Sequence, residues 1–557
     1  MTRCAVGIDF GTLSARAVVA EIGTGRILAD HAVDYPHGVM DAALPDGTRL
    51  RPDWALQDPM DYRTCLFESV AQAVKRAGVR PEDVVGLGLD VTSSTVLPVD
   101  KEGVPLCTKA VFRSDPYAWM MPWKHHGATA YAERMQRAAE AFDPDFLRRY
   151  GGRISSEWML PKLWQVAEEA PRVFDAADRY VEAGDWLVYC LTGRYAPSRA
   201  MAGYKAFAQP GRPWPDRAFL KAVSPRLEAL ADKLPRETFL MGERAGGLTA
   251  QAAEATGLLP GTPVAVANID AHVSMPAIGT AAPGSLLMIM GTSTCHILVS
   301  GTEKPIPGIS GVVKDGVFPG SYGYEAGQSC CGDHFKWMFE NALSEEVCRE
   351  AREKGVDVHA LLTERAARLR PGESGLLALD WWNGNRSILT DMELSGLMIG
   401  MTLSTRPEEI YRALIEATAY GSRVIVENFE QNGIPVKQIY ACGGIARKNG
   451  LMMQIYADVL GRSIGVARAS QAPALGSAIF GAVAAGGACG GYDTIDEAVA
   501  AMGGVEDTVY APDPSARRIY EGLYGDYLKL HDLFGRSGSD VMHRLRRLRN
   551  AVRTEGE

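Results

Sequence analysis

Short apolar runs separated by turn residues open the chain and predict β-strands. These runs cover residues 4–9, 14–21 and 26–34. An amphipathic period then predicts a helix at about 59–77, and another apolar run predicts a buried strand at 84–90. Strands that alternate with long helices indicate an α/β fold with mixed sheets.

The middle of the chain is predicted to contain a helical region, a further strand and a stretch of loops. Residues 116–180 carry Trp, Arg and Glu at helical spacing, which predicts an inserted helical region. A further strand is expected at 264–269, ending at Asp270. Residues 300–330 are rich in Gly, Pro and Ser and predict a stretch dominated by loops.

Two strong helices are predicted in the last third. The first covers 404–432 and is expected to begin after Ser404, with an acidic first turn. The second covers 449–460, with Asn449 as its N-cap. Between them an apolar strand at 438–442 runs into two glycines.

One kind of turn occurs twice, far apart in the chain. The first copy is Asp9-Phe10-Gly11-Thr12 and the second is Gly291-Thr292-Ser293-Thr294, each placed between two apolar runs. Glycine lets the backbone approach an anion closely, and exposed N–H groups and hydroxyls are donors for phosphate oxygens. Either copy alone is equally typical of an ordinary β-hairpin. The matched pair predicts two similar domains that face one nucleotide.

Carboxylates end two of the predicted strands. Asp9 is suited to hold Mg²⁺ through water, or to cap its own turn. Asp270 is suited to act as a general base that orients an attacking hydroxyl in phosphoryl transfer, or to cap the following segment. Ligands collect at the carboxyl ends of strands in open α/β sheets, so both positions predict a site there.

A glycine pair precedes the last predicted helix. Gly443-Gly444 at this place favours a flat ligand such as adenine, or a phosphate at a helix N-terminus. No G-x-G-x-x-G fingerprint and no Walker A motif occurs in the chain. His125-His126 lack further metal ligands at suitable spacing, and the basic segment Arg544–Arg553 is interpreted as a solvated final helix.

Composition sets the limits of these interpretations. The chain has 557 residues, which predicts two large domains or three smaller ones, with a boundary near 275–283. A net charge of −9 argues against nucleic acid or an anionic membrane as a partner. The ten cysteines include no C-x-x-C pair, which excludes a zinc ribbon or a redox motif of that type. Without a membrane-length apolar run or room for a signal peptide before the first strand, we expect a cytoplasmic protein.

These residues together resemble the FGGY carbohydrate kinases over nearly the whole chain. The resemblance rests on Gly7–Thr12, the strand ending at Asp270, Gly291–Thr294 and Cys442–Gly444. Residues 396–416 nearly reproduce the second signature of the family, with Leu414 as a departure, and Lys162-Leu163-Trp164 matches the first signature only in part. The family implies two actin-like (ribonuclease H-like) α/β domains with a nucleotide and sugar cleft between them. The domains are expected at 1–278, for the sugar and part of the phosphate site, and at 279–557, for ATP.

The resemblance also implies a role for each matching residue. Asp270 would be the catalytic base, Asp9 the residue that holds Mg²⁺, and the sugar would contact Ser93, Lys205, Asp270 and Glu325. ATP would contact Gly11, Thr12, Gly291, Thr292, Ser293, Thr294, Gly443, Gly444 and Asn449.

The implied reaction is transfer of phosphate from ATP to a ketopentose, with L-ribulose converted to L-ribulose 5-phosphate in the use of L-arabinose. A related kinase acting on D-ribulose, ribitol or xylulose is the first alternative. An actin-like or Hsp70-like nucleotide switch without sugar kinase activity is the second, because function belongs to the site rather than to the fold. No nucleic acid or membrane partner is expected, and the oligomeric state is left open, with a homodimer as one expectation.

Overall fold

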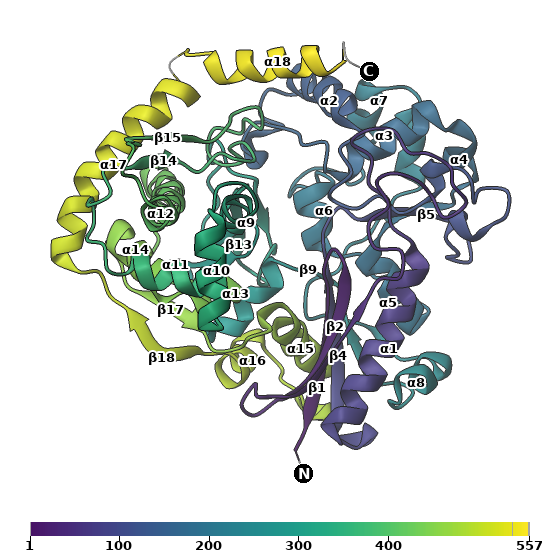
Figure 1. Cartoon of the computed structure of the whole chain (residues 1–557). Coiled ribbons are helices and arrows are strands. Elements are labelled where there is room, and N and C mark those ends of the chain that lie inside the picture. The colour runs from purple at the N-terminus through teal and green to yellow at the C-terminus, as the bar shows by residue number, and fades with distance from the viewer. Residues whose placement is uncertain (1, 537, 555–557) are drawn as a thin grey trace.

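Two seven-stranded sheets organise the structure, a computed structural model that describes residues 2–536 and 538–554 (Figure 1). The first sheet has the order β3 (Ile27–Asp34), β2 (Ser14–Glu21), β1 (Cys4–Phe10), β4 (Val84–Val91), β8 (Pro263–Ala265), β7 (Arg244–Gly247), with β9 (Asn268–Ile269) also paired to β4. The second has the order β12 (Gly311–Lys314), β13 (Tyr322–Gln328), β11 (Thr294–Ser300), β10 (Ser285–Met290), β16 (Gln438–Cys442), β17 (Ile464–Ala467), β18 (Val505–Tyr510).

The two sheets repeat one arrangement. Strand β1 pairs antiparallel with β2 and parallel with β4. In the same way, β10 pairs antiparallel with β11 and parallel with β16. The duplicated turns therefore connect equivalent strands, which confirms the prediction of two similar α/β halves.

Helices cover the sheets, and most of the predicted ones are present. The helix expected at 59–77 is α1, which Asp58 caps by accepting a hydrogen bond from the amide of Met60. The helices are α1 (Pro59–Ala77), α2 (Thr129–Phe142), α3 (Met159–Glu169), α4 (Pro171–Ala176), α5 (Ala183–Thr192), α6 (Arg199–Lys205), α7 (Arg217–Val223), α8 (Ala250–Thr256), α9 (Gly332–Asn341), α10 (Glu345–Lys354), α11 (Val358–Ala366), α12 (Pro407–Gln431), α13 (Gly444–Lys448), α14 (Gly450–Leu460), α15 (Ala472–Ala485), α16 (Ile495–Met502), α17 (Pro514–Gly535) and α18 (Val541–Thr554). Among the described helices, none is long and apolar enough to cross a membrane.

The inserted helical region predicted at 116–180 is confirmed by α2, α3 and α4. These helices, with α7, build a separate hydrophobic cluster rich in aromatic side chains. Two short strands, β5 (Val96–Val99) and β6 (Arg179–Glu182), pair antiparallel as a sheet of their own. Helix α6 ends next to this region and carries Lys205.

Three local predictions were wrong in part. The stretch at 300–330 contains β12 and β13, because glycines hid the strand period in the sequence of β13. The strand expected at 264–269 is divided into β8 and β9. Helix α12 begins at Pro407, since a proline is well suited to the first helical position, and Glu409 in its first turn accepts a hydrogen bond of 2.6 Å from the amide of Arg406.

Helix α15 lies between the two halves (Figure 1) and packs against the first sheet at backbone distance. A Cβ atom placed on Gly7 of β1 would lie 1.8 Å from the carbonyl oxygen of Ala474. One placed on Gly88 of β4 would lie 2.1 Å from the carbonyl oxygen of Ser477. Although α15 follows β17 in the chain, its apolar residues belong to the same hydrophobic core as β1 and β4. A division at 278/279 stays a prediction, and the core of the first half extends to later residues.

Replacing Gly476 by alanine tests this close packing. The new Cβ would lie 1.6 Å from the carbonyl oxygen of Val273, so helix and neighbouring backbone must separate. We expect Gly476→Ala to lower the thermal unfolding midpoint by an amount equivalent to about 1–3 kcal/mol. Gly522, inside α17, has open space around it. The matched control Gly522→Ala should therefore leave the midpoint unchanged or raise it, and equal effects of both changes would contradict the packing argument.

Candidate active site

Three carboxylates lie at one edge of the first sheet. Asp9 of β1 is in register with Asp90 of β4, because the two strands run parallel. Strand β9 pairs with the end of β4, and the amide of Asp270 donates to the carbonyl oxygen of Val91 at 3.1 Å. Asp9, Asp90 and Asp270 therefore end neighbouring strands on the same side.

Proximity and burial change the acidity of these groups. Burial raises the pKa of Asp9, although the nearby carboxyl group of Asp90 and the charge of Arg16 oppose this. The pKa of Asp90 is raised well above its usual value by burial and by the charge of Asp9. Burial, followed by the charge of Asp9, raises the pKa of Asp270 to about 7, the range in which a carboxylate works well as a general base.

Asp90 is a member of this site that sequence reasoning did not assign. Its Oδ2 accepts a hydrogen bond of 2.6 Å from the hydroxyl of Ser477 on α15. Its Oδ1 is buried and has no partner among the described residues. An acidic residue ending a buried strand, as at Asp9 and Asp270, is the signal that would have identified it.

The first turn presents two unused donors, both on Thr12. The amide of Gly11 donates to the carbonyl oxygen of Ser14, whereas no described acceptor is bonded to the amide of Thr12. The hydroxyl of Thr12 accepts a hydrogen bond of 3.2 Å from Nε1 of Trp123, which leaves its own proton available. The turn thus keeps two donors for an anion.

The second turn is built in a similar way. The amide of Gly291 donates to the carbonyl oxygen of Ser293, and no described acceptor is bonded to the amides of Thr292 and Ser293. The N-terminus of α9 supports the turn, since the amide of Gly332 donates to the carbonyl oxygen of Gly291. Thr294, in contrast, is buried and its hydroxyl has no partner among the described residues, so its side chain is not presented at the surface.

The glycine pair Gly443-Gly444 follows β16, which neighbours β10. Gly443 has φ of 98°, and a Cβ on it would lie 2.4 Å from the carbonyl oxygen of Met290. Gly444 is exposed and has open space around it. Asn449 caps α14, as predicted, by accepting from the amide of Met452 at 2.9 Å. Its amide nitrogen also donates to Tyr411 at 3.1 Å, so an adenosine contact from this side chain would have to compete with both bonds.

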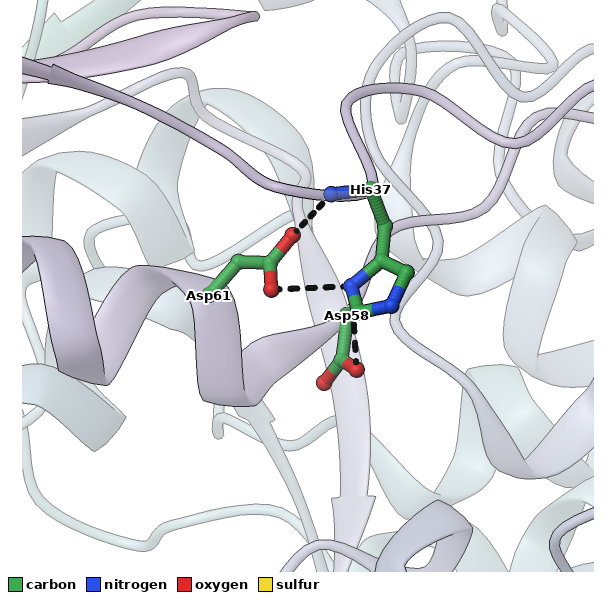
Figure 2. Close-up of side chains that lie close together, drawn as sticks. All are labelled: His37, Asp58 and Asp61. Carbon is green, nitrogen blue, oxygen red and sulfur yellow. Dashed lines mark hydrogen bonds and ion pairs between the residues drawn. The ribbon is translucent and has the colours of Figure 1, made fainter. Parts of the chain in front are cut away.

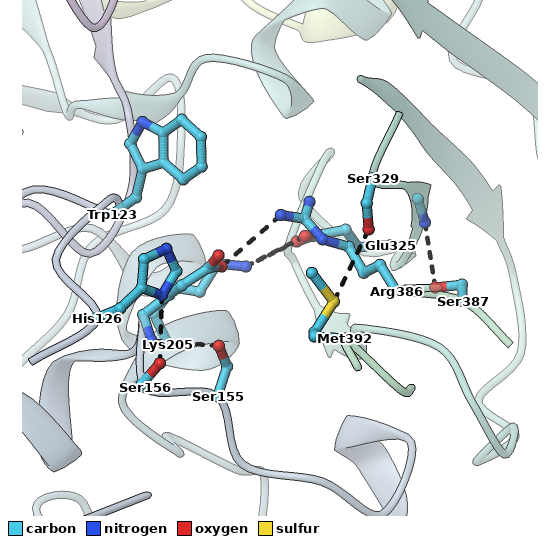
Figure 3. A network of polar contacts seen from close by, with 12 residues as sticks. Trp123, His126, Ser155, Ser156, Lys205, Glu325, Ser329, Arg386, Ser387 and Met392 are labelled. Carbon is cyan, nitrogen blue, oxygen red and sulfur yellow. Dashed lines mark hydrogen bonds and ion pairs between the residues drawn. The ribbon is translucent and has the colours of Figure 1, made fainter. Parts of the chain in front are cut away.

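Lys205 and Glu325 meet across the two halves, as Figure 3 shows. Nζ of Lys205 lies 3.2 and 3.1 Å from the two carboxylate oxygens of Glu325, and both side chains are buried. Burial acts to raise the pKa of Glu325, but the neighbouring groups, first Lys205 and then His272 and Arg386, together outweigh it and the pKa is lowered. The two predicted sugar ligands therefore form one buried ion pair between the two halves.

His272 adjoins this ion pair and was not assigned from the sequence. Its Nε2 lies 3.6 Å from Oε2 of Glu325, and neither ring nitrogen has a hydrogen-bond partner among the described residues. Burial lowers the pKa of His272 to about 4, so the ring is neutral near pH 7. A neutral ring can offer one donor and one acceptor to a polyol.

Ser93 lies on a loop whose backbone accepts a hydrogen bond from Lys162. Ser94 has φ of 60°, and its carbonyl oxygen accepts a hydrogen bond of 2.7 Å from the buried Nζ of Lys162. The same ammonium donates to the carbonyl oxygen of Pro122 at 2.7 Å. Lys162, which belongs to the partly matched signature, thus positions the Ser93 loop.

A second group of candidate metal ligands is better explained by helix capping. His37, Asp58 and Asp61 have ligand atoms within 4.8 Å of one another (Figure 2), the one such group found among the described residues. Asp58 caps α1, and Asp61 in its first turn accepts from the amide of His37 at 2.8 Å. The positive end of the helix dipole stabilises these carboxylates and disfavours a cation.

Comparison with protein families covers most of the chain. The family model described as "FGGY family of carbohydrate kinases, N-terminal domain" matches residues 4–277. The corresponding C-terminal domain model matches residues 286–485. The resemblance expected from the motifs is confirmed.

Individual relatives are similar over nearly their whole length. A ribulokinase of Halalkalibacterium halodurans is 51% identical over 99% of this chain and 98% of its own. A ribulokinase of Mycolicibacterium smegmatis is 46% identical over 99% of this chain and 97% of its own. Among solved structures, a xylulose kinase from Rhodospirillum rubrum matches with a TM-score of 0.74 and 25% identity, covering 95% of this chain and 98% of its own. Plasmodium falciparum glycerol kinase with ADP, at 16% identity over 95% of this chain and 98% of its own, shares the fold with a TM-score of 0.71.

A double-mutant cycle tests the ion pair of Lys205 and Glu325. Lys205→Met leaves a buried carboxylate without its partner, so we expect it to lower the free energy of unfolding by about 3–5 kcal/mol. The double variant Lys205→Met/Glu325→Gln should lose less than the sum of the single changes, with a coupling of about 0.5–3 kcal/mol by urea denaturation. The exposed pair Lys529–Asp526 is the control and should show no measurable coupling. If the two single changes were additive, the ion pair would contribute nothing to the free energy of unfolding.

Proposed function

The chain belongs to the FGGY family of carbohydrate kinases, and we propose that it phosphorylates L-ribulose to L-ribulose 5-phosphate with ATP as the donor. The observation that carries this proposal is the position of Asp270, whose neighbours are Asp9 at the phosphate turn and the ion pair of Lys205 and Glu325. A base between a phosphate site and a polyol site is what transfer to a hydroxyl requires. The ribulokinases of similar sequence support ribulose over xylulose or ribitol as the sugar.

Asp270 would act on the attacking hydroxyl. Its Oδ1 accepts a hydrogen bond of 2.8 Å from the amide of Ala271, which fixes the carboxylate and leaves Oδ2 to accept the proton of the sugar. As that proton moves to Asp270, the sugar oxygen bonds to the terminal phosphorus of ATP and the bond to ADP breaks. Holding these atoms in line supplies much of the acceleration.

The side chains around the ion pair of Lys205 and Glu325 would orient the sugar. Lys205 has donors and Glu325 has acceptors beyond those used in their mutual ion pair, and His272 has two unused ring nitrogens. Ser93 would contact the sugar from the loop that Lys162 supports. Because the ion pair joins the two halves, their contact also excludes water that would otherwise hydrolyse ATP.

The phosphate chain would lie between the two turns. Thr12 in the first turn, and Thr292 and Ser293 in the second, offer amides and hydroxyls as donors, while Gly11 and Gly291 let the backbone come close to the phosphates. Thr294 would contribute through its backbone. Gly443 and Gly444 would accept the adenine, because Gly444 leaves open space beside the exposed backbone.

Asp9 would hold Mg²⁺ beside the phosphates. Two adjacent carboxylates, with an unpartnered buried oxygen on Asp90, form an oxygen-rich and electron-rich site that fits this ion. When bound, Mg²⁺ supplies positive charge that neutralises phosphate oxygens. It would also offset the charge of Asp9 and so lower the pKa of Asp270.

The wider setting is part of the same proposal. An enzyme that makes L-ribulose 5-phosphate serves the use of L-arabinose. A cytoplasmic location would give it access to ATP. The homodimer and this location stay predictions.

Formation of ADP that depends on the sugar is the decisive test. With ATP and Mg²⁺ present, we expect ADP to form with L-ribulose much faster than with D-ribulose, ribitol or xylulose. Asp270→Asn should lower kcat by about 100- to 10,000-fold, because the base is lost while the shape is kept. ATP binding by calorimetry should remain near the wild-type value. Faster turnover of another sugar would reassign the substrate, and ATP consumption without any sugar dependence would favour a nucleotide switch.

The pH profile of kcat tests the role of Asp270 separately. The base is active as a carboxylate, and its pKa is raised to about 7. We therefore expect kcat to be constant above this pKa and to fall about tenfold for each unit of pH below it. Bound Mg²⁺ at Asp9 shifts this limb to lower pH. Phosphorus NMR of ADP avoids coupling enzymes that titrate themselves, and a kcat that rises as pH falls would contradict the assignment.

A further inference from the structure

Arg386 lies over the strand that carries Glu325. It belongs to the segment between β14 (Leu377–Leu379) and β15 (Leu397–Ile399), and Figure 3 shows its side chain beside Glu325. A Cβ placed on Gly327 of β13 would lie 3.3 Å from Cδ and 3.7 Å from Nη1 of Arg386. It would also lie 3.2 Å from the carbonyl oxygen of Thr294. The glycine therefore lets the arginine lie close to the end of the second turn.

The guanidinium has donors without acceptors. Its one ion pair among the described residues is with Glu157 of the first half, at 3.7 Å, which is too long for a hydrogen bond. No hydrogen bond joins its nitrogens to a described acceptor, although the side chain is only 26% exposed. Burial acts to lower the pKa of Arg386, but the carboxylates of Glu157 and Glu325 outweigh it, so the charge is kept. Five N–H donors in a rigid fork are thus available for an anion.

The half of the molecule that supplies the cation also differs in this ion pair. The ion pairs Arg149–Glu303, Arg199–Asp315 and Lys205–Glu325 all take the cation from the first half and the anion from the second. In the Arg386–Glu157 pair, the cation comes from the second half, which also carries the Gly291–Thr294 turn. Arg386 thus adds a positive charge to the wall beside that turn.

The order of residues along β13 places Arg386 between two subsites. Glu325 and Gly327 are two residues apart and so point to the same face. Gln328, the next residue, is in register with Thr294 at the start of β11. Arg386, packed over Gly327, therefore lies between Glu325 of the proposed sugar site and the Gly291–Thr294 turn.

We propose that Arg386 is a catalytic residue that contacts the phosphoryl group during its transfer from ATP to the sugar. This rests on the proposed sugar kinase function. As the sugar oxygen bonds to phosphorus and the bond to ADP breaks, negative charge spreads over the three remaining oxygens of the group. A planar guanidinium donates two parallel N–H bonds to such oxygens. Glu157 serves as its resting partner when no phosphoryl group is present.

Kinetics of Arg386 variants test this proposal. Arg386→Ala should lower kcat by about 100- to 1,000-fold, the effect of removing one donor to a developing charge. The KM values for ATP and L-ribulose should stay within about threefold, since the contact forms in the transition state. Arg386→Lys should recover part of the loss, and added guanidinium ion should partly rescue Arg386→Ala. The matched control Glu157→Gln should keep kcat within about threefold of wild type, because only the resting partner is changed.

A binding experiment supplies a readout that does not depend on turnover. ADP with aluminium fluoride and L-ribulose mimics the group in transfer and should raise the thermal unfolding midpoint of the wild type above that with ADP and L-ribulose. In Arg386→Ala this extra stabilisation should be lost, while the midpoint of the free protein is unchanged. If Arg386→Ala does not fold, Arg386→Lys carries the same comparison.

The outcomes separate this proposal from the proposed function. An active wild type with an unimpaired Arg386→Ala variant overturns the catalytic role alone. A tenfold or larger rise in KM for L-ribulose at unchanged kcat would make Arg386 a sugar ligand and also overturns it. A wild type that forms no ADP with any sugar overturns both proposals.

Discussion

The close packing of α15 against β1 and β4 is the constraint on which the rest of the structure depends. Glycines on both strands remove the side chains that would hold the helix away, so backbone lies on backbone. The helix follows β17 of the second sheet yet lies in the core of the first, which joins the two halves into one unit. Ser477 on the same helix hydrogen-bonds Asp90, so the packing also orients a carboxylate of the candidate active site.

The charges of the candidate active site complement both a cation and an anion. At the edge of the first sheet, burial and the charge of Asp9 raise the pKa values of Asp90 and Asp270, and a cation would offset the negative charge there. In the second half, Arg386 keeps its charge with no hydrogen bond to a described acceptor. An anionic phosphate chain carrying a divalent cation complements both features. Lys205 and Glu325 neutralise each other between them, which suits an uncharged polyol.

Local signals predicted much of the fold because they depend on neighbours in the chain. The hydrophobic period identified β1, β2, β3 and α1 almost to the residue, and the N-cap at Asn449 was confirmed. The prediction missed β13, since Gly323 and Gly327 replace the apolar residues that mark a strand. Those same glycines make room for Tyr204 and Arg386, so the missing signal has a structural cause.

The sequence by itself determined the strand ends and the chemical groups on them: Asp9, Asp270 and two glycine turns next to hydroxyl residues. These are properties of short segments, in which a few residues set both conformation and chemistry. Only the tertiary structure decided that Asp90 joins the carboxylates, that Lys205 meets Glu325 and that Arg386 lies beside the second turn. Each of these contacts connects segments far apart in the chain, and their partners depend on how α15 and the two sheets pack.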